Sequence, residues 1–227
     1  THLASEPHTP ANIPFVLLGT GLLWFGWFGF NAGSAGAANG QAAMAFATTN
    51  TASATAALTW IFIDGWKGRK PTALGFCVGA VVGLVAITPA AGFVTVGDSL
   101  LIGAIGAAVS NLMVHWRSQT TLDDTLDVFP CHGVGGMVGM ILTGVFAKDV
   151  GLVTGATTTF IHHLIALVGV VAYVGIGSAV LYKITNAIIP MRVTEADEEV
   201  GLDISQHGEV MDEAAANAAF GPGSRRI

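Results

Sequence analysis

The sequence predicts an all-α polytopic membrane protein with six transmembrane helices. Of the 227 residues, 52% are hydrophobic and only 11% are charged, and the mean hydropathy is +0.64, whereas about a quarter of the residues of a soluble domain are charged. Eight of the 15 acidic residues lie beyond Met191, so the long middle of the chain is almost uncharged. A bilayer core about 30 Å thick needs about 20 apolar residues per helix, and six stretches qualify: 13–32, 42–64, 71–88, 98–116, 126–147 and 160–189.

The first two stretches differ in character. The first, 13–32, ends in an aromatic run from Trp24 to Phe30, which is typical of side chains at a membrane–water interface and is expected at the outer surface. The second, 42–64, is too polar to face lipid on all sides, so we expect it inside a helical bundle. Its polar residues include Thr48, Thr49, Asn50, Thr51, Ser53 and Thr55.

The other four stretches complete the predicted bundle. The third, 71–88, has Gly75, Gly79 and Gly83 spaced four apart, and the fifth, 126–147, has Gly135 and Gly139 at the same spacing. Such spacing lets helix backbones approach closely in lipid, and helix packing is the simplest interpretation of it. The fourth ends just before a polar loop, and the sixth is long enough to tilt or to project beyond the membrane.

The distribution of basic residues predicts the topology. They lie mainly in the loops after the second, fourth and sixth stretches: Lys67, Arg69, Lys70, Arg117 and Arg192. The opposite loops hold only Lys148, so the positive-inside rule places both termini in the cytoplasm. We therefore expect a membrane domain at 13–190, preceded by a lead-in at 1–12 and followed by a cytoplasmic tail at 191–227. Since there is no initiator Met and no signal-peptide pattern, we expect a start that is processed or truncated.

Several classes of site are disfavoured. A net charge of -6 with only nine Lys and Arg argues against nucleic acid, because binding to phosphates needs a basic face. Cys77 and Cys131 both lie in apolar runs, which favours buried small hydrophobic residues over a disulfide or a metal pair. His162 and His163 open the sixth stretch, and two histidines are too few for a closed metal site.

The densest ionisable run within a span is DDTLDVFPCHGVGG at 123–136. Asp123 and Asp124 are expected to cap the fifth helix, because the positive end of the helix dipole favours carboxylates. Asp127 has a structural role or lines the inner mouth of a pathway. His132, five residues further along, is expected about 7.5 Å deeper if the helix is a continuous α-helix. An ionisable residue inside a span indicates function, and a neutral imidazole can line a pore without adding charge.

Five segments resemble successive signatures of the ammonium transporter (Amt/Mep/Rh) family, in particular its Amt branch. They are GWFGFNAGSAG at 26–36, KGRKPTALG at 67–75, AITPAAGFV at 86–94, DDTLDVFPCHGVGG at 123–136 and GLDISQHGE at 201–209. The resemblance implies helices six to eleven of an eleven-helix transporter, which are the second inverted repeat and the final helix. It also implies a lead-in at 1–12 that follows a missing first half.

The resemblance also implies roles for single residues. His132 matches the second of two pore histidines, Phe30 one of two gate phenylalanines, and Trp27 an aromatic residue of the pore wall. Asp127 matches an aspartate near the inner end of the pore, and Ser34 a part of the outer ammonium-recruiting site. In the tail, the match implies a regulatory role, which we assign to Gly201, Asp203 and His207.

At the level of the whole protein, the resemblance implies transport of ammonium or ammonia through a hydrophobic pore of each subunit of a homotrimer in the plasma membrane. It implies no enzyme activity, no cofactor and no metal, and it implies PII signalling proteins as partners at the cytoplasmic face. A different interpretation is an ammonium sensor, which would need a long soluble C-terminal domain, and a third is a non-conducting fragment.

The third interpretation follows from the repeat architecture. Substrate pathways in such folds lie between the two repeats, so one repeat supplies one wall. We expect that wall to include His132, Trp27, Phe30 and the Thr-rich second helix, and we expect this chain by itself not to conduct.

Overall fold

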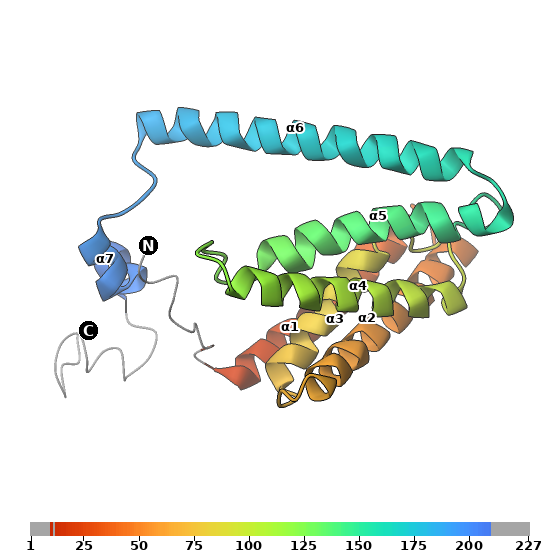
Figure 1. Ribbon diagram of the computed structural model, residues 1–227, viewed down its shortest axis with the longest axis horizontal. Coiled ribbons are helices and arrows are strands. Elements are labelled where there is room, and N and C mark those ends of the chain that lie inside the picture. The colour runs from red at the N-terminus through yellow and green to blue at the C-terminus, as the bar shows by residue number, and fades with distance from the viewer. Residues whose placement is uncertain (1–9, 11, 210–227) are drawn as a thin grey trace. The chain divides into compact units, whose positions relative to one another are not determined.

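The computed structural model describes residue 10 and residues 12–209, and every regular element in this part of the chain is helical (Figure 1). The chain divides into two compact units, Thr1–Val170 and Val171–Ile227, which are described separately below. The longer helices are α1 (Ile13–Gly33), α2 (Gly40–Trp66), α3 (Ala73–Ile87), α4 (Val96–Ser118), α5 (Gly135–Phe146) and α6 (Thr158–Ile188). The short elements are two π-helical turns, η2 (Phe129–Val134) and η4 (Asp203–His207), the 3-10 turn η3 (Leu152–Thr154), and α7 (Glu195–Val200).

Helices α1 to α4 each begin after a polar N-cap residue. The side chains of Asn12, Asn39 and Thr72 accept hydrogen bonds from the first-turn backbone N–H groups of α1, α2 and α3. Thr95 and Asp98 cap α4 reciprocally, since each side chain accepts from the backbone of the other residue. These bonds satisfy donors that have no partner within the helix, so the starts are fixed by local sequence.

Helix α2 forms the centre of the first unit. Its residues Thr48, Thr49 and Ser53 are fully buried, which confirms the prediction that this polar helix lies inside a bundle. Thr48 and Thr49 donate to Ala45 O on the preceding turn, and Ser53 donates to Ala80 O of α3 at 2.9 Å. The chain itself therefore satisfies these hydroxyl groups.

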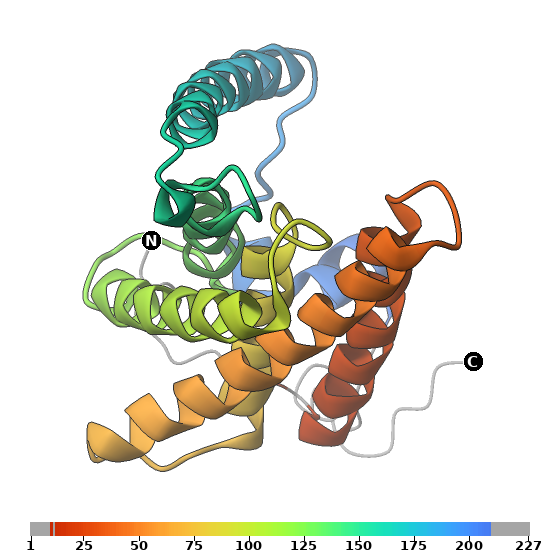
Figure 2. The ribbon, with the colours of Figure 1, turned by 90° about the vertical axis from the view of Figure 1, so that its right-hand side faces the viewer.

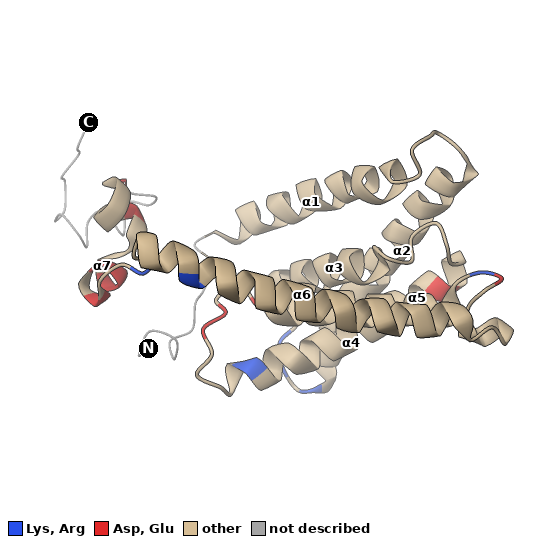
Figure 3. Cartoon of the chain, turned by 90° about the horizontal axis from the view of Figure 1, so that it is seen from above, with Lys and Arg blue, Asp and Glu red and all other residues tan. Residues whose placement is uncertain are grey.

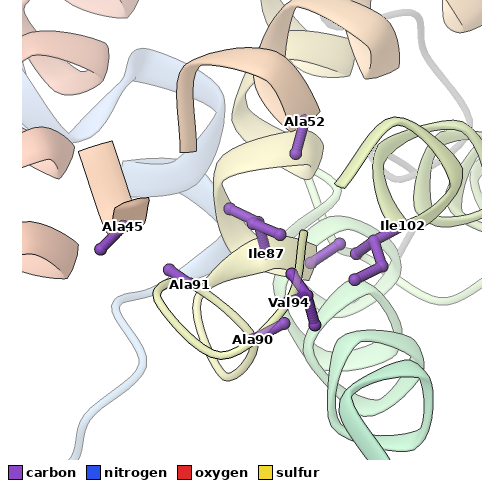
Figure 4. Close-up of a cluster of buried hydrophobic side chains, with 8 residues drawn as sticks. Ala45, Ala52, Ile87, Ala90, Ala91, Val94 and Ile102 are labelled. Carbon is purple, nitrogen blue, oxygen red and sulfur yellow. The ribbon is translucent and has the colours of Figure 1, made fainter. Parts of the chain in front are cut away.

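Glycines bring the helices around α2 into backbone contact. A Cβ on Gly83 of α3 would lie 2.6 Å from Ala52 O of α2, and one on Gly103 of α4 would overlap the same oxygen. A Cβ on Gly139 of α5 would overlap Ala86 O of α3. Such contacts explain the small residues predicted to pack these helices. Around them lies an apolar cluster drawn from α2, α3, the turn after α3, and α4 (Figure 4), which includes Ala45, Ala52, Ile87, Ala90, Ala91, Val94 and Ile102.

Helix α1 lies against α2 and α3 at the edge of the first unit (Figure 2). Among its exposed side chains are Phe15, Leu22, Phe25 and Phe30. Within the described residues, four segments are long and apolar enough to cross a membrane: α1, α4, Phe129–Phe146 and α6. Helix α3 has the apolar character but only 15 residues, and α2 is long enough but too polar to meet this criterion.

Charged residues gather at helix ends and in connecting loops (Figure 3). Buried Asp64 at the end of α2 accepts from Arg69 Nη2 at 2.5 Å and from Asn111 Nδ2 at 3.2 Å. Arg69 also donates to Asn111 Oδ1 at 3.0 Å. Because charge-assisted hydrogen bonds are among the stronger ones, this group fixes the loop after α2 to the end of α4.

The entry into the fifth span differs from the predicted continuous helix over 126–147. Asp124 accepts from Val128 N and Phe129 N at 2.9 and 2.8 Å, so its capping role is confirmed. Asp123 instead accepts from the Thr125 hydroxyl, so the same prediction for Asp123 is wrong. The span then begins as the π-helical turn η2 and becomes α-helical only at Gly135, so the α-helical rise assumed for His132 does not apply to this segment.

The second unit includes the end of α6 and the described part of the tail. Thr194 caps α7, and Arg192 donates two hydrogen bonds to the Glu198 carboxylate at 2.7 and 2.9 Å. Gly201 ends α7 with a φ of +97°, which glycine adopts without strain. Most of the predicted lead-in 1–12, and residues 210–227 of the predicted tail, lie outside the described residues.

Candidate functional site

His132 lines a small cavity between three parts of the first unit. The cavity is about 150 Å³ and is otherwise apolar except for Thr20 and two thiols. Its lining comes from α1, α3 and the start of the fifth span: Val16, Thr20, Leu74, Cys77, Val78, Val81, Leu126, Cys131 and His132. Since one water occupies about 30 Å³ of liquid volume, the cavity can admit a molecule of that size beside the imidazole.

Local sequence sets the position of His132. Asp124 caps the segment, Pro130 stands in the first turn of η2, where a missing N–H costs nothing, and Asp127 has a φ of +52°. The Asp127 carboxylate accepts two hydrogen bonds from Arg117 at 3.0 and 2.6 Å. The structure thus joins Asp127 to the end of α4, and Asp127 is not among the residues that line the His132 cavity. Sequence reasoning missed this role of Arg117, although the residue was noted for its charge.

Trp27 and Phe30 lie together near the other end of α1. Their rings meet edge to face with centroids 5.8 Å apart, a geometry that aromatic pairs favour. Trp27 Nε1 donates to Thr88 Oγ1 of the α3 C-terminus at 2.8 Å. Both rings border an apolar hollow of about 600 Å³ on α1. Thr88 was not singled out from the sequence, because a threonine at a helix end gives no signal of a distant indole partner.

Ser34 caps the end of α1, and its hydroxyl donates to Phe30 O at 2.7 Å. Its proton is therefore engaged, and its oxygen lone pairs remain able to accept. The same end of α1 is fixed to α2, because Asn31 Nδ2 donates to Thr49 Oγ1 at 3.0 Å. Ser34 is exposed, so the structure brings it close to Phe30 at an accessible position.

One face of α1 connects these two places. It consists of residues spaced three or four apart, and we call it the α1 face: Val16, Thr20, Leu23, Trp27, Phe30 and Ser34. Residues at this spacing lie above one another on a helix. Val16 and Thr20 of this face line the His132 cavity, and Leu23, Trp27 and Phe30 border the larger hollow.

The structure corrects the expectation for the second helix and describes the predicted residues of the tail. The prediction that the Thr-rich second helix supplies a polar wall is wrong for Thr48, Thr49 and Ser53, because they are buried within the chain. In the tail, Asp203 and His207 begin and end η4, directly after Gly201. Within residue 10 and residues 12–209, His, Cys, Asp and Glu form no group of three that could hold a metal.

Comparison with known proteins decides the family. The model of the Ammonium Transporter Family matches residues 3–211. The chain belongs to the ammonium transporter family. This is a family of integral membrane transporters rather than enzymes, which agrees with the fold class and the resemblance derived from the sequence.

Individual relatives extend this result. The chain is 43% identical to ammonium transporter Amt1 of Archaeoglobus fulgidus over 210 residues, which cover 90% of the chain and 53% of that relative. The crystal structure of Saccharomyces cerevisiae Mep2 matches with a TM-score of 0.79 and 36% identity, over 84% of this chain and 46% of Mep2. A sensor Amt protein matches with a TM-score of 0.76 and 29% identity, over 87% of this chain and 50% of that one. The chain thus spans about half the length of these ammonium transporter family relatives.

Proposed function

We propose that this chain supplies part of a pathway for ammonium or ammonia that follows the α1 face and passes His132. The continuity of that face carries the proposal. From Val16 to Ser34 the helix rises by 18 residue steps, or about 27 Å at 1.5 Å per step, which is close to the thickness of a bilayer core. An exposed hydroxyl lies at one end of it, and the imidazole cavity lies at the other.

The groups along the α1 face have the chemistry needed for successive steps of ammonium passage. Near Ser34, the aromatic rings of Phe30 and Trp27 attract a cation, and the free lone pairs of Ser34 can accept an ammonium N–H. The apolar hollow beyond them opposes entry of a charge, since desolvating an ion is costly without compensating partners. Transfer of a proton from ammonium to water at the exposed Ser34 end, before this hollow, would leave neutral ammonia, to which His132 can offer a donor or an acceptor nitrogen.

Replacement of His132 tests this function in the protein at its native length. His132→Ala should lower ammonium flux by about tenfold or more, because it removes a polar group of the pathway without breaking a helix. His115→Ala is the matched control, since His115 is exposed on α4 and, within the described part of the chain, its ring forms a hydrogen bond with Gln119 one turn further along the same helix. Flux into liposomes, followed by internal pH, gives the measurement.

Three outcomes separate the interpretations. Undiminished flux in His132→Ala would refute the pathway role of His132. Loss of assembly would indicate that His132 serves packing. Ammonium binding without flux in the unaltered protein would favour the sensor interpretation, but the likeness to the sensor Amt protein is no greater than that to Mep2.

We also infer the setting of the whole protein. The family resemblance supports a homotrimer in the plasma membrane, and the Lys/Arg asymmetry supports a cytoplasmic tail. The tail segment with Gly201, Asp203 and His207 has a defined fold, in which Ser205 Oγ donates to Asp197 O at 3.3 Å. An ordered tail is suited to regulation, including docking of a PII protein at the cytoplasmic face. Deletion beyond Arg192 should alter transport activity or its control, and full activity with full PII control after the deletion would contradict this role.

A further inference from the structure

We propose that Thr20 is a second hydrogen-bonding contact for the permeating molecule, beside His132 in the same cavity. This inference rests on the proposed transport function and deepens it. It begins with the position of Thr20, which is 9% exposed and lines the 150 Å³ cavity together with His132. Thr20 belongs to the α1 face, two helical turns from Trp27.

The hydroxyl of Thr20 differs from those of most helical threonines in this chain. Thr49, Thr88 and Thr143 each donate to the carbonyl four residues earlier, at 2.6 to 2.8 Å. Within the described part of the chain, the Thr20 hydroxyl makes no hydrogen bond. Thr20 Oγ1 is not one of the fully enclosed unpartnered side-chain atoms of the described residues, so the hydroxyl is accessible and can form a hydrogen bond with an occupant of the cavity.

The other residues that line the cavity offer few hydrogen-bonding groups to an occupant. Apart from His132 and the weakly polar thiols of Cys77 and Cys131, the other lining side chains are aliphatic: Val16, Leu74, Val78, Val81 and Leu126. Ammonia has three N–H donors and one lone pair, and a single neutral imidazole can satisfy only part of them. A threonine hydroxyl donates and accepts, so it offers what the imidazole leaves unmet. Thr20 would thus lower the cost of desolvating ammonia at this point of the pathway.

The test compares Thr20→Val, which keeps the shape and removes the hydroxyl, with Thr20→Ser, which restores it. Both are made in the protein at its native length and reconstituted in liposomes. Thr20→Val should raise the half-saturating ammonium concentration, or lower the flux at limiting ammonium, by about three- to tenfold, which is the effect of one hydrogen bond. Thr20→Ser should return to within about twofold of the unaltered protein. Thr51→Val is the control, because the half-buried Thr51 donates to Ala47 O and lines no cavity at His132.

The outcomes are distinguishable from failure of the main proposal. Unchanged flux and half-saturation in Thr20→Val would overturn the inference, and so would an equal loss in Thr20→Val and Thr20→Ser. Loss of flux in His132→Ala with unaltered transport in Thr20→Val would leave the transport function intact and refute only the role of Thr20. A third outcome is undiminished flux in His132→Ala together with a loss in Thr20→Val that Thr20→Ser restores. This outcome would support the contact at Thr20 and refute the pathway role of His132.

Discussion

Helix α1 and the helices packed around α2 all contain several glycines in apolar sequences, but they use their surfaces in opposite ways. In α2 to α5, a Cβ added to Gly83, Gly103 or Gly139 would meet the backbone of a neighbouring helix. In α1, a Cβ added to Gly19, Gly21 or Gly26 would meet nothing within 4 Å. The first set of glycines therefore permits close packing, whereas the second set leaves the surface of α1 open around the hollow at Trp27 and Phe30.

Hydroxyl groups show the same contrast. In α2, Thr48, Thr49 and Ser53 are fully buried and bonded to carbonyl groups. In α1, Thr20 has no such bond within the described residues, and Ser34 is exposed. The buried hydroxyl groups of these three α2 residues are thus satisfied by the chain, whereas the Thr20 hydroxyl and the lone pairs of Ser34 remain available on the α1 face. Between α1 and α2, this difference in hydrogen bonding separates packing residues from candidate pathway residues.

The largest expected effect tests the packing side of this comparison. Gly103→Ala should destabilise the protein by more than about 3 kcal/mol, because its Cβ would overlap Ala52 O and backbone atoms cannot yield as a side-chain end can. Gly21→Ala in α1 is the matched control and should be neutral or stabilising by up to about 1 kcal/mol, since alanine favours a helix and the site is open. Thermal unfolding in detergent and monodispersity after purification give the measurement.

A result that reverses this order would break the comparison. If Gly21→Ala destabilised the protein as strongly as Gly103→Ala, α1 would have a close neighbour on its open side in the protein at its native length. Equal tolerance of both changes would show that the contact of α4 with Ala52 relaxes easily.

Much of the helical layout was predicted from hydropathy. The predicted span 13–32 corresponds to α1, Ile13–Gly33, and 98–116 lies within α4, Val96–Ser118, because both stretches are long and apolar. The π-helical turn that contains His132 could not be predicted, since it depends on the positive φ at Asp127 and on the distant Arg117. The local sequence there is compatible with an ordinary α-helix.

Only part of the candidate site could be predicted from the sequence. His132 was first identified as an ionisable residue within a span, and the family motifs assigned roles to His132, Trp27, Phe30 and Ser34. The partners Thr88 and Thr20 were missed, because each is an ordinary threonine whose role depends on which helix lies opposite. Tertiary contacts decide whether such a hydroxyl bonds to its own helix, to an indole or to a cavity.

The smallest expected effect concerns how firmly α1 is held on the packed helices. Trp27 Nε1 donates to Thr88 Oγ1 at 2.8 Å, and Thr88 itself donates to Leu84 O, so the hydroxyl links the indole to the end of α3. Thr88→Val should cost about 1 kcal/mol, the usual value of one such hydrogen bond. For a chain of this size that corresponds to a decrease of about 2–4 °C in Tm. Thr143→Val is the control, since Thr143 donates only to Gly139 O of its own helix among the described residues, and its decrease in Tm should be smaller. Thr88→Ser should restore the Tm, because it keeps the acceptor for the indole. If Thr88→Val cost no more than Thr143→Val, the indole contact would add nothing to the docking of α1, and the bond between Asn31 and Thr49 would remain as the polar attachment to test next.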